Sequence, residues 1–154
     1  YNVSLWGPFA EYLNTIRKTR VNNKFLPGIK LPSSIKIVDS LNQALKSADM
    51  VVFAIPSKFA SSVLKQIKKE NVSFKNKVFV NVTKGFDFDR LCTISTLIKA
   101  ELGNINMAVL SGPTIASEVA KGIPSTAVAA SRGINTAKIV QKTFNSSTFP
   151  IPPI

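Results

Sequence analysis

A lysine at the end of an apolar segment is the first residue of this sequence that could do chemistry. Lys84 follows the apolar segment Val78–Val82, which is typical of a buried strand in a parallel sheet. Open α/β sheets bind ligands outside the carboxyl ends of their strands. An ammonium group at such a place could hold a phosphate or a polarised oxygen, whereas the alternative is an ordinary solvated loop lysine.

A turn of small residues after a second apolar segment is the other candidate. Residues 107–110 are continuously apolar, the turn Ser-Gly-Pro-Thr follows at 111–114, and a helical pattern runs over 115–121. Gly112 would let a ligand approach the backbone closely, Thr114 offers a hydroxyl, and a helix N-terminus favours an anion. The alternatives are that Gly112 only shapes the turn and that Thr114 caps its own helix.

Alternating strand and helix patterns must position these residues. Apolar runs predict strands over residues 1–6, 35–38, 50–55, 78–82, 107–110 and 125–130. Amphipathic spacing predicts helices over residues 9–20, 40–46, 58–69, 90–100, 115–121 and 135–144, and residues 22–32 read as a loop. Short connections between alternating elements predict a doubly wound, mainly parallel α/β sheet.

The charge balance narrows the class of ligand. The chain has 20 basic and 8 acidic residues, a formal net charge of +12, which suits nucleic acid or a phosphorylated small molecule. Lysines are spread over every segment, and the aromatic residues lie mostly within apolar patterns rather than on a basic face. This distribution favours a phosphorylated small molecule over nucleic acid, so we predict no nucleic-acid partner.

Cysteine content and hydropathy indicate the compartment. The single cysteine, Cys92, excludes an internal disulfide and suits a reducing environment. No apolar run reaches the roughly 20 residues that a bilayer span needs, and no secretory signal pattern opens the chain. We therefore predict a cytoplasmic protein with no membrane span and no metal site.

Five blocks in a fixed order carry a resemblance to a known family. The blocks are Val3-Ser4-Leu5-Trp6-Gly7, Phe25-Leu26-Pro27-Gly28, Val52-Phe53-Ala54-Ile55-Pro56-Ser57, Thr83-Lys84-Gly85 and Ser111-Gly112-Pro113-Thr114-x-Ala116-x-Glu118. Together they resemble the N-terminal domain of the NAD(P)-dependent glycerol-3-phosphate dehydrogenases. The resemblance implies a Rossmann-like fold, NAD or NADP as cofactor and a homodimer. It also implies the interconversion of sn-glycerol 3-phosphate and dihydroxyacetone phosphate, which supplies precursors of glycerophospholipids.

The resemblance also implies roles for individual residues. The implied cofactor-binding residues are Pro8, Pro56, Lys84 and Ala116, and the implied substrate-binding residues are Lys84, Gly112 and Thr114. Pro8 stands where the family usually has arginine or histidine beside the adenosine ribose, so the choice between NAD and NADP stays open. No catalytic acid or base is identifiable, because the resemblance implies a proton-transfer lysine in a following helical domain.

The resemblance further implies that this sequence is part of a longer one. The family places a first strand and a Gly-rich turn before residues 1–6, and no G-x-G-x-x-G occurs here. We therefore predict that residues 1–145 are a partial dinucleotide-binding domain, that residues 146–154 are a proline-rich tail, and that the C-terminal helical domain is absent. The alternatives are another NAD(P)-dependent reductase of the same superfamily and a basic, non-enzymatic binding module.

Overall fold

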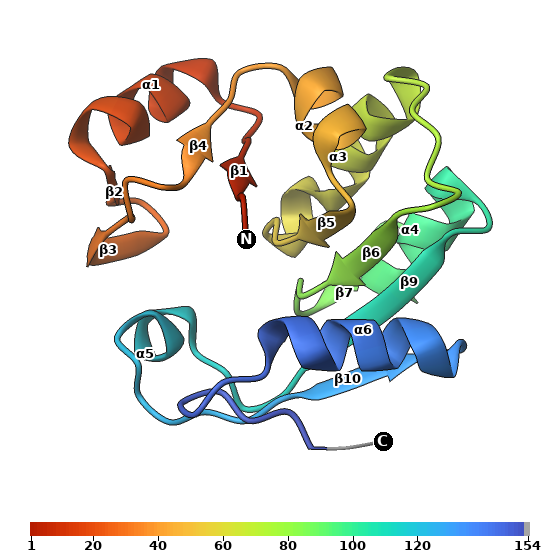
Figure 1. Cartoon of the computed structure of the whole chain (residues 1–154). Coiled ribbons are helices and arrows are strands. Elements are labelled where there is room, and N and C mark those ends of the chain that lie inside the picture. The colour runs from red at the N-terminus through yellow and green to blue at the C-terminus, as the bar shows by residue number, and fades with distance from the viewer. Residues whose placement is uncertain (153–154) are drawn as a thin grey trace.

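Two separate sheets form the centre of the computed structural model, which describes residues 1–152 (Figure 1). The smaller sheet pairs β1 (Ser4–Leu5) with β4 (Lys36–Ile37) in parallel. The larger sheet has the order β10-β9-β6-β5, and its parallel strands are β5 (Met50–Phe53), β6 (Val78–Asn81) and β9 (Asn106–Ser111). Strand β10 (Val128–Ser131) runs antiparallel to β9. The protein is therefore an α/β structure.

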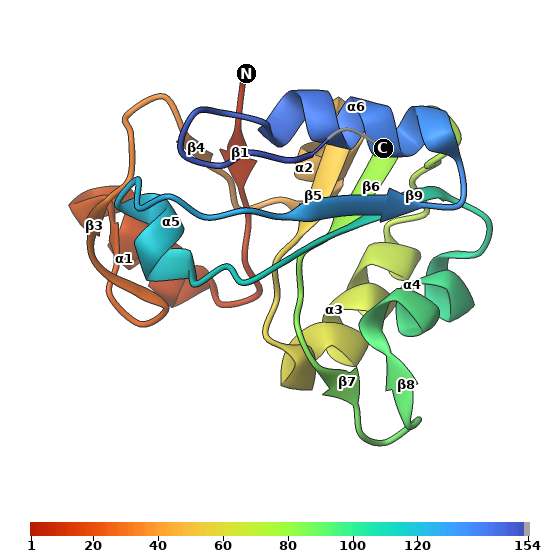
Figure 2. The same cartoon turned by 90° about the horizontal axis from the view of Figure 1, so that it is seen from below.

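Helices cover both faces of the larger sheet (Figure 2). Helices α3 (Ser57–Lys69) and α4 (Ile94–Leu102) lie on one face, and α6 (Ile134–Phe144) lies on the other. Neighbouring residues of a strand point to opposite faces, so Phe79 packs into the cluster with α3 and α4 while Val80 packs into the cluster with α6. Two-sided burial explains why the strand segments are apolar without alternation.

The predicted helix starts are partly confirmed. Helix α2 (Leu41–Ser47) begins after Ser40, whose side chain accepts a hydrogen bond from the Gln43 backbone N–H at 3.1 Å. Helix α1 spans Ala10–Thr19. Helix α3 includes Ser57, one residue before the predicted start at 58, and Pro56 precedes it without a side-chain cap.

A short hairpin occupies the segment that the sequence predicts as a loop over residues 22–32. Strand β2 (Val21–Asn22) pairs antiparallel with β3 (Leu26–Lys30). The Asn22 side chain accepts hydrogen bonds from the Tyr12 hydroxyl at 2.7 Å and from the Phe25 backbone N–H at 3.3 Å. The loop prediction is wrong, because a short edge strand tolerates proline and the side chains of Tyr12 and Asn22 stabilise the turn.

A second hairpin replaces the start of the helix predicted over residues 90–100. Strands β7 (Phe86–Asp87) and β8 (Cys92–Thr93) pair antiparallel, and α4 begins only at Ile94. The Asp87 carboxylate accepts a hydrogen bond from the Arg90 backbone N–H at 2.8 Å and forms the turn. Leu91, which lies within the predicted helix, is 85% exposed at the end of the hairpin.

The segment after α6 packs against the domain. The backbone N–H of Ser125 donates to the Thr148 carbonyl at 3.0 Å, and Ile151 is buried in the cluster beneath α6. Residues 125–127 thus contact residues 148–150, and the strand predicted over 125–130 starts at Val128 instead. The domain boundary at residue 145 stays a prediction.

The predicted single sheet is divided between β1 and β5. Within residues 1–152 no hydrogen-bonded ladder joins these two strands, and Val52 of β5 is 45% exposed although its strand is apolar. The two sheets are each paired internally, so the edges of β1 and β5 that face each other remain free of a partner strand in the described part of the chain.

An ion pair joins the turn of the β7–β8 hairpin to α4. Glu101, whose side chain is 10% exposed, lies 2.7 Å from the Arg90 guanidinium and 3.7 Å from the Lys68 ammonium. The hydrogen bond from Arg90 lowers the pKa of Glu101, against the opposing effect of its burial. A carboxylate with a lowered folded-state pKa stabilises the protein above its unfolded-state pKa and loses that contribution as the pH falls through the folded-state value.

We therefore expect the Glu101→Gln variant to be less stable than wild type at pH 7, with a difference that shrinks toward pH 3. Urea unfolding at a series of pH values measures this difference. Glu11→Gln, at an exposed position with no ion pair among the described residues, is the control and should follow wild type. A constant Glu101→Gln difference over the whole pH range would contradict the expectation.

Candidate functional site

A cleft of about 930 Å³ opens between the two sheets. It is lined by Leu5 of β1 and Val52 of β5, by the residues that follow β5 and β6, and by one side of α5 (Ala116–Ala120). Its volume falls within the range typical of small-molecule sites, roughly 300–1,000 Å³. Five of the six predicted site residues line this cleft: Pro8, Pro56, Lys84, Thr114 and Ala116.

The Lys84 ammonium joins the two stretches that the sequence singled out. Its Nζ donates to the Gly112 carbonyl at 3.0 Å and to the Thr114 carbonyl at 2.7 Å. Strand β6 is paired with β9 in parallel, so the ends of both strands lie at the same edge of the sheet. An ammonium has three N–H donors, and the third remains for an oxygen of a ligand in the cleft.

Two polar side chains just before Lys84 hold its backbone. Thr83 Oγ1 accepts a hydrogen bond from the Ile55 N–H at 3.2 Å and donates to the Ile55 carbonyl at 2.9 Å. Asn81, only 2% exposed, accepts from the Thr83 N–H at 3.1 Å and donates to Ser95 Oγ at 3.3 Å. Thr83 and Asn81 were not predicted as site residues; the available signals were the polar Asn81 within an apolar run and the place of Thr83 beside Lys84 in one of the five blocks.

We expect Thr83→Val to lower the free energy of unfolding by about 1–2 kcal/mol, because the Ile55 backbone groups lose their partner in a partly buried place. Thr83→Ser keeps the hydroxyl and is the matched control. We expect it to lower the free energy of unfolding by a smaller amount. Urea unfolding of both variants measures the difference. A valine variant that loses no more stability than the serine variant would contradict the role given to these hydrogen bonds, because valine keeps the methyl group and removes only the hydroxyl.

Gly112 is the one predicted site residue that does not line the cleft. A Cβ at this position would overlap the Thr126 carbonyl oxygen and lie 2.9 Å from Ala127 Cα. Glycine is therefore required for the close approach of β9 to residues 126–127, a reason different from the predicted approach of a ligand. Its carbonyl still takes part in the site, because it accepts the Lys84 hydrogen bond. A substrate contact by Gly112 stays a prediction.

Thr114 does not cap the helix that follows it. The residue before α5 is Ile115, which makes no side-chain cap, and the Thr114 hydroxyl lies 3.4 Å from the Gly112 carbonyl. The helix contains only Ala116–Ala120, two residues fewer than the predicted 115–121, so an anion site that depends on its N-terminus loses support. The capping interpretation is wrong, and Thr114 lines the cleft instead.

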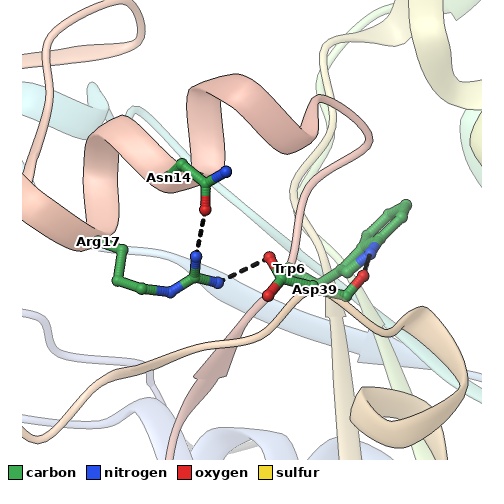
Figure 3. Close-up of polar contacts among 4 residues, drawn as sticks. All are labelled: Trp6, Asn14, Arg17 and Asp39. Carbon is green, nitrogen blue, oxygen red and sulfur yellow. Dashed lines mark hydrogen bonds and ion pairs between the residues drawn. The ribbon is translucent and has the colours of Figure 1, made fainter.

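A polar cluster at the end of β1 holds one wall of the cleft (Figure 3). Trp6 Nε1 donates to the Asp39 carbonyl at 3.2 Å, and the Asp39 carboxylate pairs with Arg17 of α1 at 2.7 Å. Arg17 also donates to the Asn14 side chain. These contacts tie α1 to the residues that follow β1 and β4, and Trp6 lines the cleft from there. Pro8 follows two residues later.

Several aromatic residues that were not predicted as site residues line the cleft. Phe9, 44% exposed, precedes α1, and Phe59 lies in the first turn of α3. Tyr12 and Phe25 line the same region. A detectable signal was the position of Phe9 and Phe59 at the starts of helices that follow strands, where an α/β sheet faces its ligand.

The described residues add two negative observations. No helix within residues 1–152 is long and apolar enough to cross a membrane. In the same residues, no group of three or more His, Cys, Asp or Glu side chains is placed to hold a metal ion.

Comparisons with known proteins relate this site to one family. A family model for the "NAD-dependent glycerol-3-phosphate dehydrogenase N-terminus" matches residues 1–137. A glycerol-3-phosphate dehydrogenase [NAD(P)+] from Fusobacterium nucleatum is 36% identical over 153 residues, which cover 98% of this chain and 45% of that protein. The corresponding protein of Bacillus velezensis is 37% identical over 154 residues, which cover 98% and 44%.

Solved structures agree with the sequence comparison. Glycerol-3-phosphate dehydrogenase from Coxiella burnetii has a TM-score of 0.86 and 25% identity, covering 97% of this chain and 45% of that chain. The enzyme from Plasmodium falciparum has a TM-score of 0.86 and 28% identity, covering 99% and 43%. The chain thus spans less than half the length of these relatives. The resemblance carried by the five sequence blocks is confirmed: the chain belongs to the family of the NAD-dependent glycerol-3-phosphate dehydrogenase N-terminus.

Proposed function

We propose that this chain is the cofactor-binding and substrate-contacting part of an NAD(P)-dependent glycerol-3-phosphate dehydrogenase. The complete enzyme would interconvert sn-glycerol 3-phosphate and dihydroxyacetone phosphate. The observation that carries the proposal is the Lys84 ammonium, which bonds the Gly112 and Thr114 carbonyls at the edge of the cleft in a chain of this family. The proposed enzyme is a cytoplasmic homodimer, and sedimentation of the complete protein tests the dimer.

The finer fold belongs to the same proposal. In a complete, doubly wound Rossmann-like sheet, a further parallel strand would lie between β1 and β5 and deliver a Gly-rich turn to the cofactor pyrophosphate. The free edges of β1 and β5 and the exposure of Val52 support this placement. Residues of the protein outside these 154 would supply that strand, its turn and the helical domain.

The residues present fit a nicotinamide dinucleotide. Ala54, Ile55 and Val82 form an apolar wall beside Lys84, and the aromatic side chains at the other end of the cleft suit an adenine ring. When bound, the nicotinamide supplies or accepts the hydride. Pro8, Pro56 and Ala116 lie along the cleft at places that allow the contacts proposed for them.

Lys84 binds and orients the substrate in this proposal. Two of its N–H groups hold the turn at 112–114, and the third donates to a substrate oxygen, where its positive charge stabilises developing negative charge. Thr114 offers its hydroxyl on the same side of the cleft. No proton-transfer group is assigned to this chain; that role belongs to the helical domain.

Steady-state assay of the complete enzyme tests the function. We expect turnover of dihydroxyacetone phosphate with NADH or NADPH. We also expect a much lower kcat/KM with dihydroxyacetone, which lacks the phosphate. Turnover of unphosphorylated hydroxy acids or oxo acids in place of dihydroxyacetone phosphate would refute the proposal and favour another reductase of the same superfamily.

A further inference from the structure

An aromatic cluster lies at the end of the cleft beside β1. The rings of Phe9 and Phe59 meet edge to face with their centroids 5.8 Å apart, and both residues line the cleft. Tyr12 and Phe25 form a second edge-to-face pair at 6.3 Å on the same side. Aromatic faces of this kind stack with nucleotide bases. The end of the cleft beside Pro8 is therefore suited to the base of a nucleotide.

Two ammonium groups flank these rings. Lys24 Nζ lies 5.7 Å from the Phe9 centroid and 5.5 Å from the Phe25 centroid, and Lys58 Nζ lies 4.9 Å from the Phe59 centroid. The Lys24 backbone is anchored, because its N–H donates to the Tyr12 hydroxyl at 2.7 Å. In residues 1–152 neither ammonium has a carboxylate partner within 4.0 Å. Both charges are free to pair with an anion.

The same end of the cleft offers no carboxylate. No Asp or Glu within residues 1–152 lines the cleft. The Asp39 carboxylate is directed to Arg17 (Figure 3), and Glu11 is exposed on α1. An unmodified adenosine ribose is usually bound through its 2′-hydroxyl by Asp or Glu, whereas a 2′-phosphate is bound by a basic side chain. The groups present suit the phosphate.

We propose that this cleft selects NADP(H) over NAD(H) and that Lys24 pairs with the 2′-phosphate. The proposal rests on the function proposed above. The adenine would lie against Phe9 and Phe59, and its ribose would then come within reach of the Lys24 ammonium, which lies beside the Phe9 ring at the edge of the cleft. A compact ammonium pairs well with phosphate, and the net charge of +12 strengthens the attraction for the more anionic cofactor. Lys24 thereby supplies the positive charge that a proline at position 8 cannot provide.

Isothermal titration calorimetry on the complete enzyme tests the proposal without relying on catalysis. The probes are NADPH and NADH, together with adenosine 2′,5′-bisphosphate and AMP, and each pair differs only in the 2′-phosphate. We expect NADPH to bind about tenfold or more tightly than NADH, and its advantage to decrease with salt. The Lys24→Met variant should bind NADPH and the bisphosphate about tenfold more weakly than wild type does. Its affinities for NADH and AMP should stay within about twofold of the wild-type values.

Lys30→Met is the matched control. Lys30 lies on the same hairpin, is exposed and contacts none of these rings, so all four affinities should stay at wild-type values. Two results would overturn the proposal: equal binding of NADPH and NADH by wild type, or equal loss of both in Lys24→Met. Tight NADPH binding without turnover of dihydroxyacetone phosphate would refute the proposed reaction and leave the Lys24 assignment standing. Turnover of dihydroxyacetone phosphate with a preference for NADH would refute the role given to Lys24 and leave the proposed reaction standing.

Discussion

Replacing Lys84 with methionine is expected to lower kcat/KM of the complete enzyme at least about a hundredfold. Methionine keeps most of the apolar stem but removes the ammonium that bonds the Gly112 and Thr114 carbonyls. If that charge stabilises negative charge developing on the substrate oxygen, the loss falls mainly on kcat. If it only binds the substrate phosphate, the loss falls mainly on KM. Steady-state kinetics with dihydroxyacetone phosphate separates the two.

Stability should change little in the Lys84→Met variant. An exposed lysine usually contributes less than about 0.5 kcal/mol, so the melting temperature should stay near the wild-type value. Lys138→Met, on α6 and away from the cleft, is the control and should keep both kinetic parameters. A Lys84→Met enzyme within threefold of wild type in kcat and in KM would exclude the proposed role of Lys84.

Gly112→Ala is expected to lower the free energy of unfolding by at least about 2 kcal/mol. The added methyl group would overlap the Thr126 carbonyl oxygen and lie 2.9 Å from Ala127 Cα. Both neighbours are backbone atoms, so no side-chain rotation relieves the overlap, and β9 must move away from residues 126–127. That movement also displaces the carbonyls that hold Lys84, so kcat/KM should fall together with stability. Urea unfolding and steady-state kinetics measure the two effects.

Gly7→Ala is the matched control for this substitution. Its added Cβ would meet Leu13 Cδ2 at 3.7 Å, an ordinary contact, and Gly7 has no positive φ that would strain alanine. Its unfolding free energy should stay within about 0.5 kcal/mol of wild type, measured without cofactor because Gly7 lines the cleft. Equal stability of the two alanine variants would show that β9 and residues 126–127 separate easily, against the role given to Gly112.

Local patterns were sufficient to predict most of the strands and helices. The apolar segments at 50–55 and 78–82 contain β5 and β6, and the segment at 107–110 lies within β9. Most of the apolar stripe of α3 is buried as its spacing indicates. These predictions succeed because a strand buried on both faces and an amphipathic helix each need a particular order of neighbouring residues. The same ordered segments also carried the resemblance to the family.

Side-chain contacts that hydrophobic periodicity does not reveal decided the elements that were predicted wrongly. Leu91 lies within a helical pattern, yet the Asp87 side chain makes a hairpin turn and leaves it exposed. The hairpin of β2 and β3 depends on the Tyr12 hydroxyl, which comes from another element. Phe9 has the spacing of a core residue, yet it is 44% exposed and borders the cleft, where its ring meets the Phe59 ring of α3 edge to face.

The sequence by itself determined that Lys84 follows one buried strand and that a turn of small residues follows another, since both features can be seen in the succession of neighbouring residues. Only the tertiary structure decided that the ammonium bonds two carbonyls of that turn, because the parallel pairing of β6 with β9 places both strand ends at one edge. Packing likewise decided why residue 112 is glycine: the backbone of residues 126–127 comes too close for a Cβ. The grouping of Lys24 with Phe9 and Phe59 beside the cleft is also a tertiary property, since the three residues come from separate segments of the chain.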